Sequence, residues 1–316
     1  MPLTTTRPTR QTPDLHRVHR LESPFPLAYL CHALWGACYA ATTPHQLLRT
    51  PVLLAVAANL IPLIAQNVLN AAMDIPIDAR TPGKSGVARA AQRLGRRRLF
   101  GIATAEMTLA LLLACGVAVH LGRPLIAAGV AAGILVEYLY NLEPVRLKKR
   151  GLANPISLGA HFSVLPCLST FNAVRPDFPG YLWPLFLGLW LLLIGRTLWW
   201  SLPDAPADQA AGLTPPAVRY GTSRALILAV GATATALTLI AWGLAWSLGP
   251  GAALLGTTGC GIFLISKLRL TPATLHALHE TRMRRHTLTF VIGADVLLVA
   301  LPLAGSVLGQ VANVLR

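Results

Sequence analysis

Residues 51–78 read PVLLAVAANLIPLIAQNVLNAAMDIPID. The first part, about residues 51–73, is an apolar run of the length that a helix needs to cross the ~30 Å hydrocarbon core of a bilayer. Asp74 and Asp78 follow directly where that run ends. This stretch therefore predicts a membrane-spanning helix that delivers two carboxylates to one face of the membrane.

The rest of the chain repeats this apolar pattern. Of 316 residues, 54% are hydrophobic and 12% are charged, about half the charge of a typical soluble domain. This composition excludes a disordered chain, a disulfide scaffold and a coiled coil. Nine apolar runs predict an all-α membrane protein with a nine-transmembrane-helix bundle, at about residues 25–42, 51–73, 99–121, 124–142, 152–174, 180–200, 225–248, 249–266 and 287–308. Residues 1–24 are expected to form a tail, and residues 25–316 a single transmembrane domain.

The basic residues predict the orientation. The formal net charge is +15, and 22 of the 27 Lys and Arg residues lie in the first segment or in segments that follow every second run. Only four lie in the alternate segments. By the positive-inside rule, the N-terminal tail is cytoplasmic and the C-terminus lies on the opposite side. The tail has no apolar h-region, so no cleaved signal peptide is expected. Most of the positive charge then serves orientation and contact with lipid headgroups, not nucleic-acid binding.

The sequence contains an acidic motif twice. Residues 200–208 read WSLPDAPAD, so Asp204 and Asp208 repeat the Asp-x-Pro-x-Asp pattern of Asp74 and Asp78, 130 residues later. Each copy lies at the predicted cytoplasmic end of a span. The repeat predicts two related helical halves that bring two acidic ends together.

Paired carboxylates near a membrane are costly unless a cation compensates them. Mg²⁺ binds a few carboxylates, waters and phosphate oxygens, so the four aspartates and Asn70 are predicted to hold two Mg²⁺ around a diphosphate. Four basic residues close to the motifs would balance the remaining negative charge: Arg80, Lys84, Arg146 and Lys148. The alternative is that the aspartates are ordinary helix caps or solvated loop charges, but that does not account for the doubled motif.

These motifs resemble those of the UbiA superfamily of intramembrane prenyltransferases. The NxxxDxxxD motif matches Asn70, Asp74 and Asp78, and the DxxxD motif matches Asp204 and Asp208. Residues 140–151, YNLEPVRLKKRG, resemble the loop that runs from a tyrosine to a lysine in this family. The resemblance implies nine helices, an Mg²⁺ cofactor, an isoprenyl diphosphate substrate, and roles for Tyr140 and Lys148 beside the aspartates in catalysis.

The predicted function is Mg²⁺-dependent transfer of a prenyl group from an isoprenyl diphosphate to an aromatic or lipophilic acceptor. It would take place in a multi-pass protein of the cell membrane whose active site faces the cytoplasm. A UbiA-type terpene cyclase would use the same motifs. A secondary transporter with an internal repeat is a third hypothesis, but the repeated aspartates lie at one membrane face and not at the midplane, where transporters bind.

Several ionisable residues fall inside the predicted spans. Arg196 lies close before the second motif and is expected to contact the diphosphate or Asp204. The others are expected either to touch substrate or to join helices by hydrogen bonds: Glu106, Glu137, His161 and Asp295. The five cysteines show no metal-site spacing and are predicted to pack. Residues 271–285 predict an amphipathic surface helix.

Overall fold

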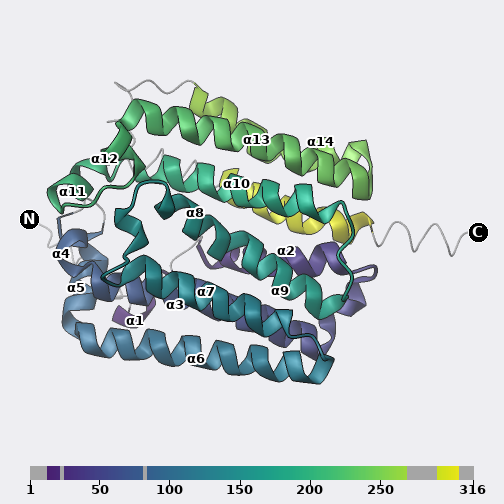
Figure 1. The fold of residues 1–316 in the computed structure, drawn as a ribbon, viewed down its shortest axis with the longest axis horizontal. Coiled ribbons are helices and arrows are strands. Elements are labelled where there is room, and N and C mark those ends of the chain that lie inside the picture. The colour runs from purple at the N-terminus through teal and green to yellow at the C-terminus, as the bar shows by residue number, and fades with distance from the viewer. Residues whose placement is uncertain (1–12, 22–24, 81–83, 269–289, 306–316) are drawn as a thin grey trace, which may run out of the picture.

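The computed structural model describes residues 13–21, 25–80, 84–268 and 290–305. Over these residues the chain forms helices and no strand. The long helices run side by side, and the short helices α1 (Asp14–Val18), α4 (Ile75–Asp78), α5 (Ser85–Leu94), α11 (Ala205–Ala210) and α12 (Pro216–Tyr220) gather at one end of the bundle (Figure 1).

Each of the nine apolar runs coincides with helix in the described part of the chain. The helices are α2 (Phe25–Ala40), α3 (Thr50–Met73), α6 (Arg96–Leu121), α7 (Leu125–Asn141), α8 (Ala153–Gly159) with α9 (Leu165–Val174), α10 (Leu182–Ser201), α13 (Thr222–Leu248), α14 (Pro250–Leu268) and Phe290–Gly305. Four of them, α3, α6, α10 and α13, are long and apolar enough to cross a membrane. That all nine runs cross it therefore stays a prediction. A short helix, η1 (Pro44–Leu48), connects α2 to α3.

The fifth run differs from the uniform helix that the sequence predicts. A π-helical turn, η3 (Ala160–Val164), lies between α8 and α9. Such turns are rare, and they are frequently found at functional sites. The predicted amphipathic segment 271–285 lies outside the described residues.

The two halves share one arrangement of helices. In the first half, the chain runs from α3 through α4 and α5 to α6, and α3 packs closely against α6. In the second half, the chain runs from α10 through α11 and α12 to α13, and α10 packs closely against α13. Each acidic motif thus lies between two long helices that pack against each other. The repeated acidic motif of the sequence thus occupies the same position in two similar sets of helices.

Small residues allow α10 and α13 to approach closely. A Cβ atom added to Gly195 would lie 2.3 Å from the Thr233 Oγ1 atom, and one added to Gly188 would lie 2.8 Å from Ile240 Cγ1. Close packing of this kind is a main source of helix association in membranes. It fixes the helix from which the second acidic motif extends.

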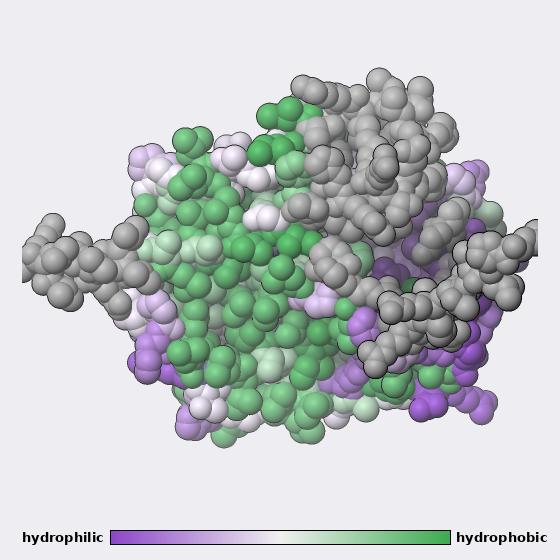
Figure 2. All heavy atoms as spheres, turned by 180° about the vertical axis from the view of Figure 1, so that it is seen from behind, coloured by the Kyte–Doolittle hydropathy of each residue, from purple (hydrophilic) through white to green (hydrophobic). Residues whose placement is uncertain are grey.

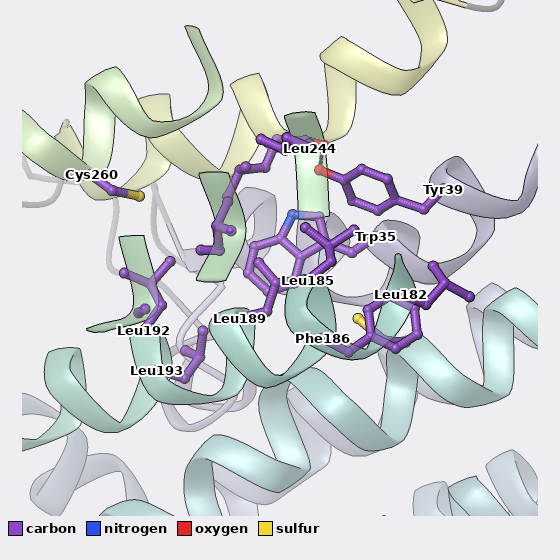
Figure 3. Packing of buried hydrophobic residues seen from close by; sticks show 14 of the residues in the cluster. Trp35, Tyr39, Leu182, Leu185, Phe186, Leu189, Leu192, Leu193, Leu244 and Cys260 are labelled. Carbon is purple, nitrogen blue, oxygen red and sulfur yellow. Dashed lines mark hydrogen bonds between the residues drawn. The ribbon is translucent and has the colours of Figure 1, made fainter. Parts of the chain in front are cut away.

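The largest buried cluster among the described residues joins α2, α9, α10, α13, α14 and the helix Phe290–Gly305. Trp35 and Tyr39 lie among Leu182, Leu189 and Leu244 (Figure 3). Four of the cysteines are buried and free, including Cys260 in this cluster, whereas Cys115 is exposed on α6. The four buried cysteines agree with the packing role that the sequence predicts.

The outer surface is suited to lipid. Apolar side chains cover the middle of the molecule, and hydrophilic side chains gather mainly at the end that carries the short helices (Figure 2). Exposed hydrophobic residues include Leu112, Val119, Ile227, Trp246 and Leu254. Large exposed apolar areas of this kind mark a membrane or partner surface.

Residues 13–21 pack against this hydrophilic end. Val18 is fully buried beside α5, and Asp14 accepts hydrogen bonds from the Arg93 guanidinium. The His19 Nε2 atom lies 2.8 Å from a carboxylate oxygen of Glu106. These contacts bring Arg20 to the acidic motifs.

Candidate active site at the hydrophilic end

Both acidic motifs have the same local structure. In each one a long helix ends, and a short helix begins with proline in its first turn, where proline costs no hydrogen bond. The Asp78 backbone N–H donates to the Asp74 carbonyl at 2.8 Å, and the Asp208 backbone N–H donates to the Asp204 carbonyl at 2.9 Å. The two carboxylates of each motif are therefore held one helical turn apart.

The two motifs line one cavity of about 280 Å³. Predicted site residues from both halves lie on its wall: Asn70, Asp74, Asp78, Lys84, Tyr140, Lys148, Asp204 and Asp208. The wall also includes apolar residues, among them Ile77, Leu158 and Leu213. The structure thus brings together acidic groups that are 130 residues apart in the chain.

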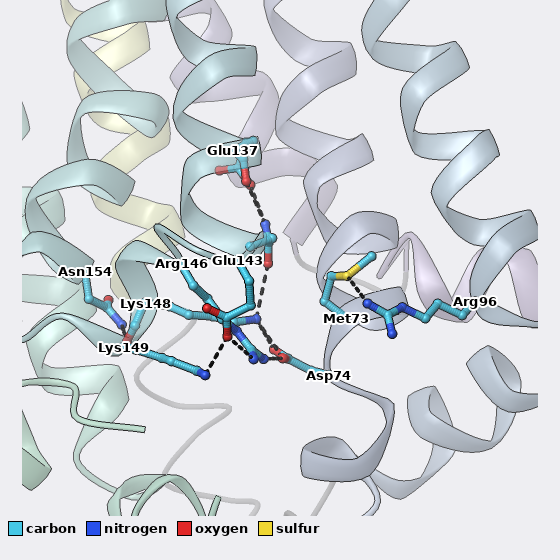
Figure 4. A network of polar contacts seen from close by, with 10 residues as sticks. Met73, Asp74, Arg96, Glu137, Glu143, Arg146, Lys148, Lys149 and Asn154 are labelled. Carbon is cyan, nitrogen blue, oxygen red and sulfur yellow. Dashed lines mark hydrogen bonds and ion pairs between the residues drawn. The ribbon is translucent and has the colours of Figure 1, made fainter. Parts of the chain in front are cut away.

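Basic side chains pair with the aspartates. The Lys148 ammonium group donates to both Asp74 carboxylate oxygens, at 2.6 and 2.7 Å, and Arg146 donates to one of them at 3.1 Å (Figure 4). Lys84 donates to Asp204 at 2.8 Å and so joins the two halves. These cations compensate buried negative charge that would otherwise be costly.

The loop between α7 and α8 positions two of these cations. Arg146 has a left-handed backbone conformation, with φ at +38°, which is strained for a residue with a side chain. A single 3₁₀ turn, η2 (Leu147–Lys149), follows and buries Lys148. The turn leaves Lys149 partly exposed, 2.6 Å from the exposed Glu143. The loop therefore turns Arg146 and Lys148 inward to Asp74 and leaves Lys149 and Arg150 on the outside.

The remaining two aspartates have raised pKa values. Burial, together with the charges of Asp204 and Asp74, raises the pKa of the Asp208 carboxyl to about 7, against the opposing effect of Lys84 and Lys148. Burial also raises the pKa of Asp78, against the opposing effect of Lys84 and Arg20. A divalent cation would relieve this repulsion and favour the ionised form.

The donor set fits Mg²⁺ that is held together with a phosphate group. Among the described residues, no three His, Cys, Asp or Glu side chains are close enough to form a metal site by themselves. Mg²⁺ does not need such a cage, since it commonly binds one or two carboxylates together with waters and substrate phosphates. Asp74, Asp78, Asp204, Asp208 and the Asn70 amide supply hard oxygen atoms on one wall, as this mode requires.

The raised pKa of Asp208 predicts that Mg²⁺ affinity depends on pH. Below pH 7 the cation must displace a proton from this carboxyl, so its affinity should fall by up to about tenfold per pH unit. Above pH 7 the carboxyl is ionised and the affinity should level off. Calorimetric titration of the purified protein with Mg²⁺ and inorganic diphosphate, from pH 5.5 to 8.5, measures this. Asp208→Asn should flatten the profile, and an unchanged profile in that variant would assign the proton elsewhere.

Three predicted residues do not line the cavity. Arg146 lines a neighbouring pocket, although its guanidinium reaches Asp74. Arg80 is exposed and does not line the cavity either. Arg196 is buried, and its guanidinium lies 2.7 Å from an Asp295 carboxylate oxygen. The expected contact of Arg196 with Asp204 is therefore corrected. Eight residues separate the two along the chain, about 12 Å of helix, and Arg196 lies on the face of α10 that meets the C-terminal helix.

The ion pair of Arg196 and Asp295 predicts a stability effect. Removal of one partner leaves an uncompensated buried charge, so Arg196→Leu should lower the free energy of unfolding by about 3–5 kcal/mol. Thermal unfolding of the detergent-solubilised protein measures this. The double variant Arg196→Leu/Asp295→Leu should recover part of the loss. A double variant that is less stable than the single one would contradict the pairing.

Several residues on the cavity wall were not predicted. Arg20, from the N-terminal segment, and Phe25, at the start of α2, both line it, and so does Asn154 from α8. Asn154 donates a hydrogen bond to the Lys148 carbonyl at 3.1 Å. No motif marks these three residues, because their positions depend on how segments far apart in the sequence pack.

The chain is similar to known proteins over much of its length. The sequence model described as the UbiA prenyltransferase family matches residues 29–288. A lycopene elongase/hydratase of Halobacterium salinarum is 29% identical over 203 residues, which are 63% of this chain and 68% of that protein. A structure of a UbiA homologue from Archaeoglobus fulgidus bound to GPP and Mg²⁺ superposes with a TM-score of 0.69 at 18% identity, covering 93% of this chain and 99% of that one. The same homologue bound to DMAPP and Mg²⁺ superposes with a TM-score of 0.67 at 17% identity, with the same coverage.

Proposed function

Because the chain belongs to the UbiA prenyltransferase family, whose members are integral membrane proteins, we propose that it transfers a prenyl group from an isoprenyl diphosphate to a lipophilic acceptor. The observation that carries the proposal is the single cavity in which both acidic motifs meet Lys148 and Lys84. The fold that it shares with a homologue that binds GPP and Mg²⁺ supports a diphosphate as the occupant.

The acidic and the basic residues of the cavity have different proposed roles. The four aspartates and Asn70 would hold Mg²⁺, which supplies charge stabilisation for the departing diphosphate. Lys148 and Lys84 can donate charge-assisted hydrogen bonds to oxygens of the same group. Donors of this kind accelerate the reaction if they bind the leaving group more tightly as its negative charge develops.

An aromatic row leads from the cavity into the bundle. The ring centroids of Phe25 and Tyr29 are 6.4 Å apart, and those of Tyr29 and Phe162 are 5.8 Å apart. Phe162 in turn lies 5.7 Å from the His32 ring. We propose that the prenyl tail lies along this row, since aromatic faces attract a cation and exclude water from it.

The acceptor is proposed to be lipophilic. One relative is named a lycopene elongase/hydratase, which supports a hydrocarbon acceptor. A hydrocarbon acceptor would donate π electrons to the allylic cation and then lose a proton to the released diphosphate, so that charge and atoms balance.

The proposal is tested by supplying donors with and without acceptor. Membranes that contain the protein are incubated with Mg²⁺ and C10, C15 or C20 diphosphate, alone and with a polyene or a phenol, and diphosphate release and lipid products are measured. Acceptor-dependent release that stops in EDTA supports transfer. A cyclised hydrocarbon formed from the donor alone indicates a terpene cyclase, and no release under any condition overturns the proposal.

We also propose that the cavity faces the cytoplasm. The proposal rests on the charge asymmetry of the loops, which predicts a cytoplasmic N-terminus. A reporter fused after Arg316 should be active only on the opposite side of the membrane, as an odd number of spans requires. Cytoplasmic activity of that reporter would contradict nine spans.

A further inference from the structure

Lys148 is held by more than its ion pair with Asp74. Asn154 donates to the Lys148 backbone carbonyl at 3.1 Å, and the Lys148 ammonium group donates to the Asn141 Oδ1 atom at 3.3 Å. Lys148 is 5% exposed and Asn141 is 2% exposed. The ammonium group thus has two side-chain anchors within the bundle end, Asp74 and Asn141.

The orientation of the Asn141 amide is determined by its surroundings. Its Nδ2 atom donates to the Glu137 backbone carbonyl at 3.1 Å and to a Glu137 carboxylate oxygen at 3.2 Å (Figure 4). A backbone carbonyl can only accept, so the amide nitrogen faces Glu137. The amide oxygen is then the atom presented to Lys148.

Glu137 is itself fixed inside the bundle. It is fully buried, and its other carboxylate oxygen lies 3.5 Å from His161 Nε2. His161 belongs to the π-helical turn η3, and its ring packs beside Gly133 on α7, where an added Cβ atom would lie 3.4 Å from the His161 Nδ1 atom, an ordinary contact distance. A row of polar groups therefore runs from the π-helical turn through Glu137 and Asn141 to Lys148.

We propose that Asn141, backed by Glu137, is a positioning residue that holds the Lys148 ammonium group toward the cavity. The inference rests on the proposed contact of Lys148 with the diphosphate. Asp74 is a proposed metal ligand as well, whereas Asn141 does not line the cavity and its amide oxygen contacts the Lys148 ammonium group. No direct contact of Asn141 or Glu137 with substrate is required.

The experiment combines two variants in one cycle. Asn141→Leu should lower kcat about tenfold with little change in KM, as loss of a group that orients an active-site residue commonly does. In a Lys148→Ala background the same substitution should have no further effect. If the Asn141→Leu effect multiplies with that of Lys148→Ala, Asn141 acts structurally and the inference is overturned. If Lys148→Ala has the same kcat and KM as the wild type, the proposed role of Lys148 is itself contradicted.

Two further variants separate positioning from folding. Glu137→Gln retains an acceptor for the Asn141 amide and should stay within about threefold of the wild type, whereas Glu137→Leu should slow the reaction in the same way as Asn141→Leu. Tyr138→Phe is the matched control, because Tyr138 lies on α7 beside Glu137 and donates a 2.9 Å hydrogen bond to Thr104 on α6. Loss of that hydrogen bond should leave kcat unchanged. Equal losses in Glu137→Gln and Glu137→Leu would contradict the proposal.

Binding provides a readout that does not depend on turnover. Titration with Mg²⁺ and inorganic diphosphate should show weaker binding in Lys148→Ala and in Asn141→Leu, to a similar degree. Wild-type affinity in Asn141→Leu together with a loss in Lys148→Ala would show that Asn141 does not position the ammonium group.

Discussion

Asp204→Ala is expected to lower kcat/KM by at least about a hundredfold. This carboxylate is a proposed Mg²⁺ ligand, and a metal that binds the leaving group supplies several kcal/mol of transition-state stabilisation; a loss of about 2.7 kcal/mol is already a hundredfold. Asp74→Ala should have an effect of the same size. Diphosphate release from the donor, measured with both variants in membranes, tests the expectation.

The two variants differ in their risk to folding. Asp74 neutralises the buried Lys148, so its loss also leaves a buried cation with one partner fewer. Asp204 is 26% exposed and pairs with Lys84, itself 21% exposed, so Asp204→Ala is the cleaner test. Asp177→Ala, an exposed aspartate in the loop between α9 and α10, should keep wild-type rates. Near-normal rates in both motif variants would refute the metal–diphosphate assignment.

Lys148→Ala is expected to slow the reaction by at least about tenfold, which corresponds to ~1.4 kcal/mol. A charge-assisted hydrogen bond contributes about 1.5–3 kcal/mol. If it strengthens as the diphosphate departs, its loss lowers kcat more than it raises KM. Steady-state kinetics with the donor that is turned over measure both constants.

Lys149→Ala provides the matched control for this prediction. Lys149 is the next residue in the same 3₁₀ turn, but it pairs with the exposed Glu143 and not with Asp74. Exposed ion pairs contribute little, so this variant should be close to the wild type. Small, equal effects at both positions would mean that the loop serves only to contact anionic lipid.

The sequence predicts the helical architecture well because its signal is local. The apolar runs coincide with helices, and the doubled Asp-x-Pro-x-Asp pattern marks the points where α3 and α10 end. Proline at the start of a new turn explains both endings from sequence alone. Composition and periodicity, however, do not establish that the shorter helices cross a membrane.

The partners of the site residues are less predictable. Lys84 could equally pair with Asp78 in its own half, and nothing in the sequence selects Asp204. Arg196 and Asp295 each stand out as isolated charges, yet their pairing depends on which face of α10 meets the last helix. The π-helical turn has no sequence marker, because a single extra residue in a helix changes neither composition nor apolar length.

The cation that neutralises each motif has a consequence for biosynthesis. Asp74 pairs with Lys148 and Arg146, which are 74 and 72 residues further along the chain, so the first motif is compensated within the half that leaves the ribosome first. The partner of Asp204, Lys84, precedes it by 120 residues and is already made when Asp204 emerges. The first motif can therefore have its carboxylate Asp74 neutralised before the second half is made, and Lys84 is already present when Asp204 is synthesised.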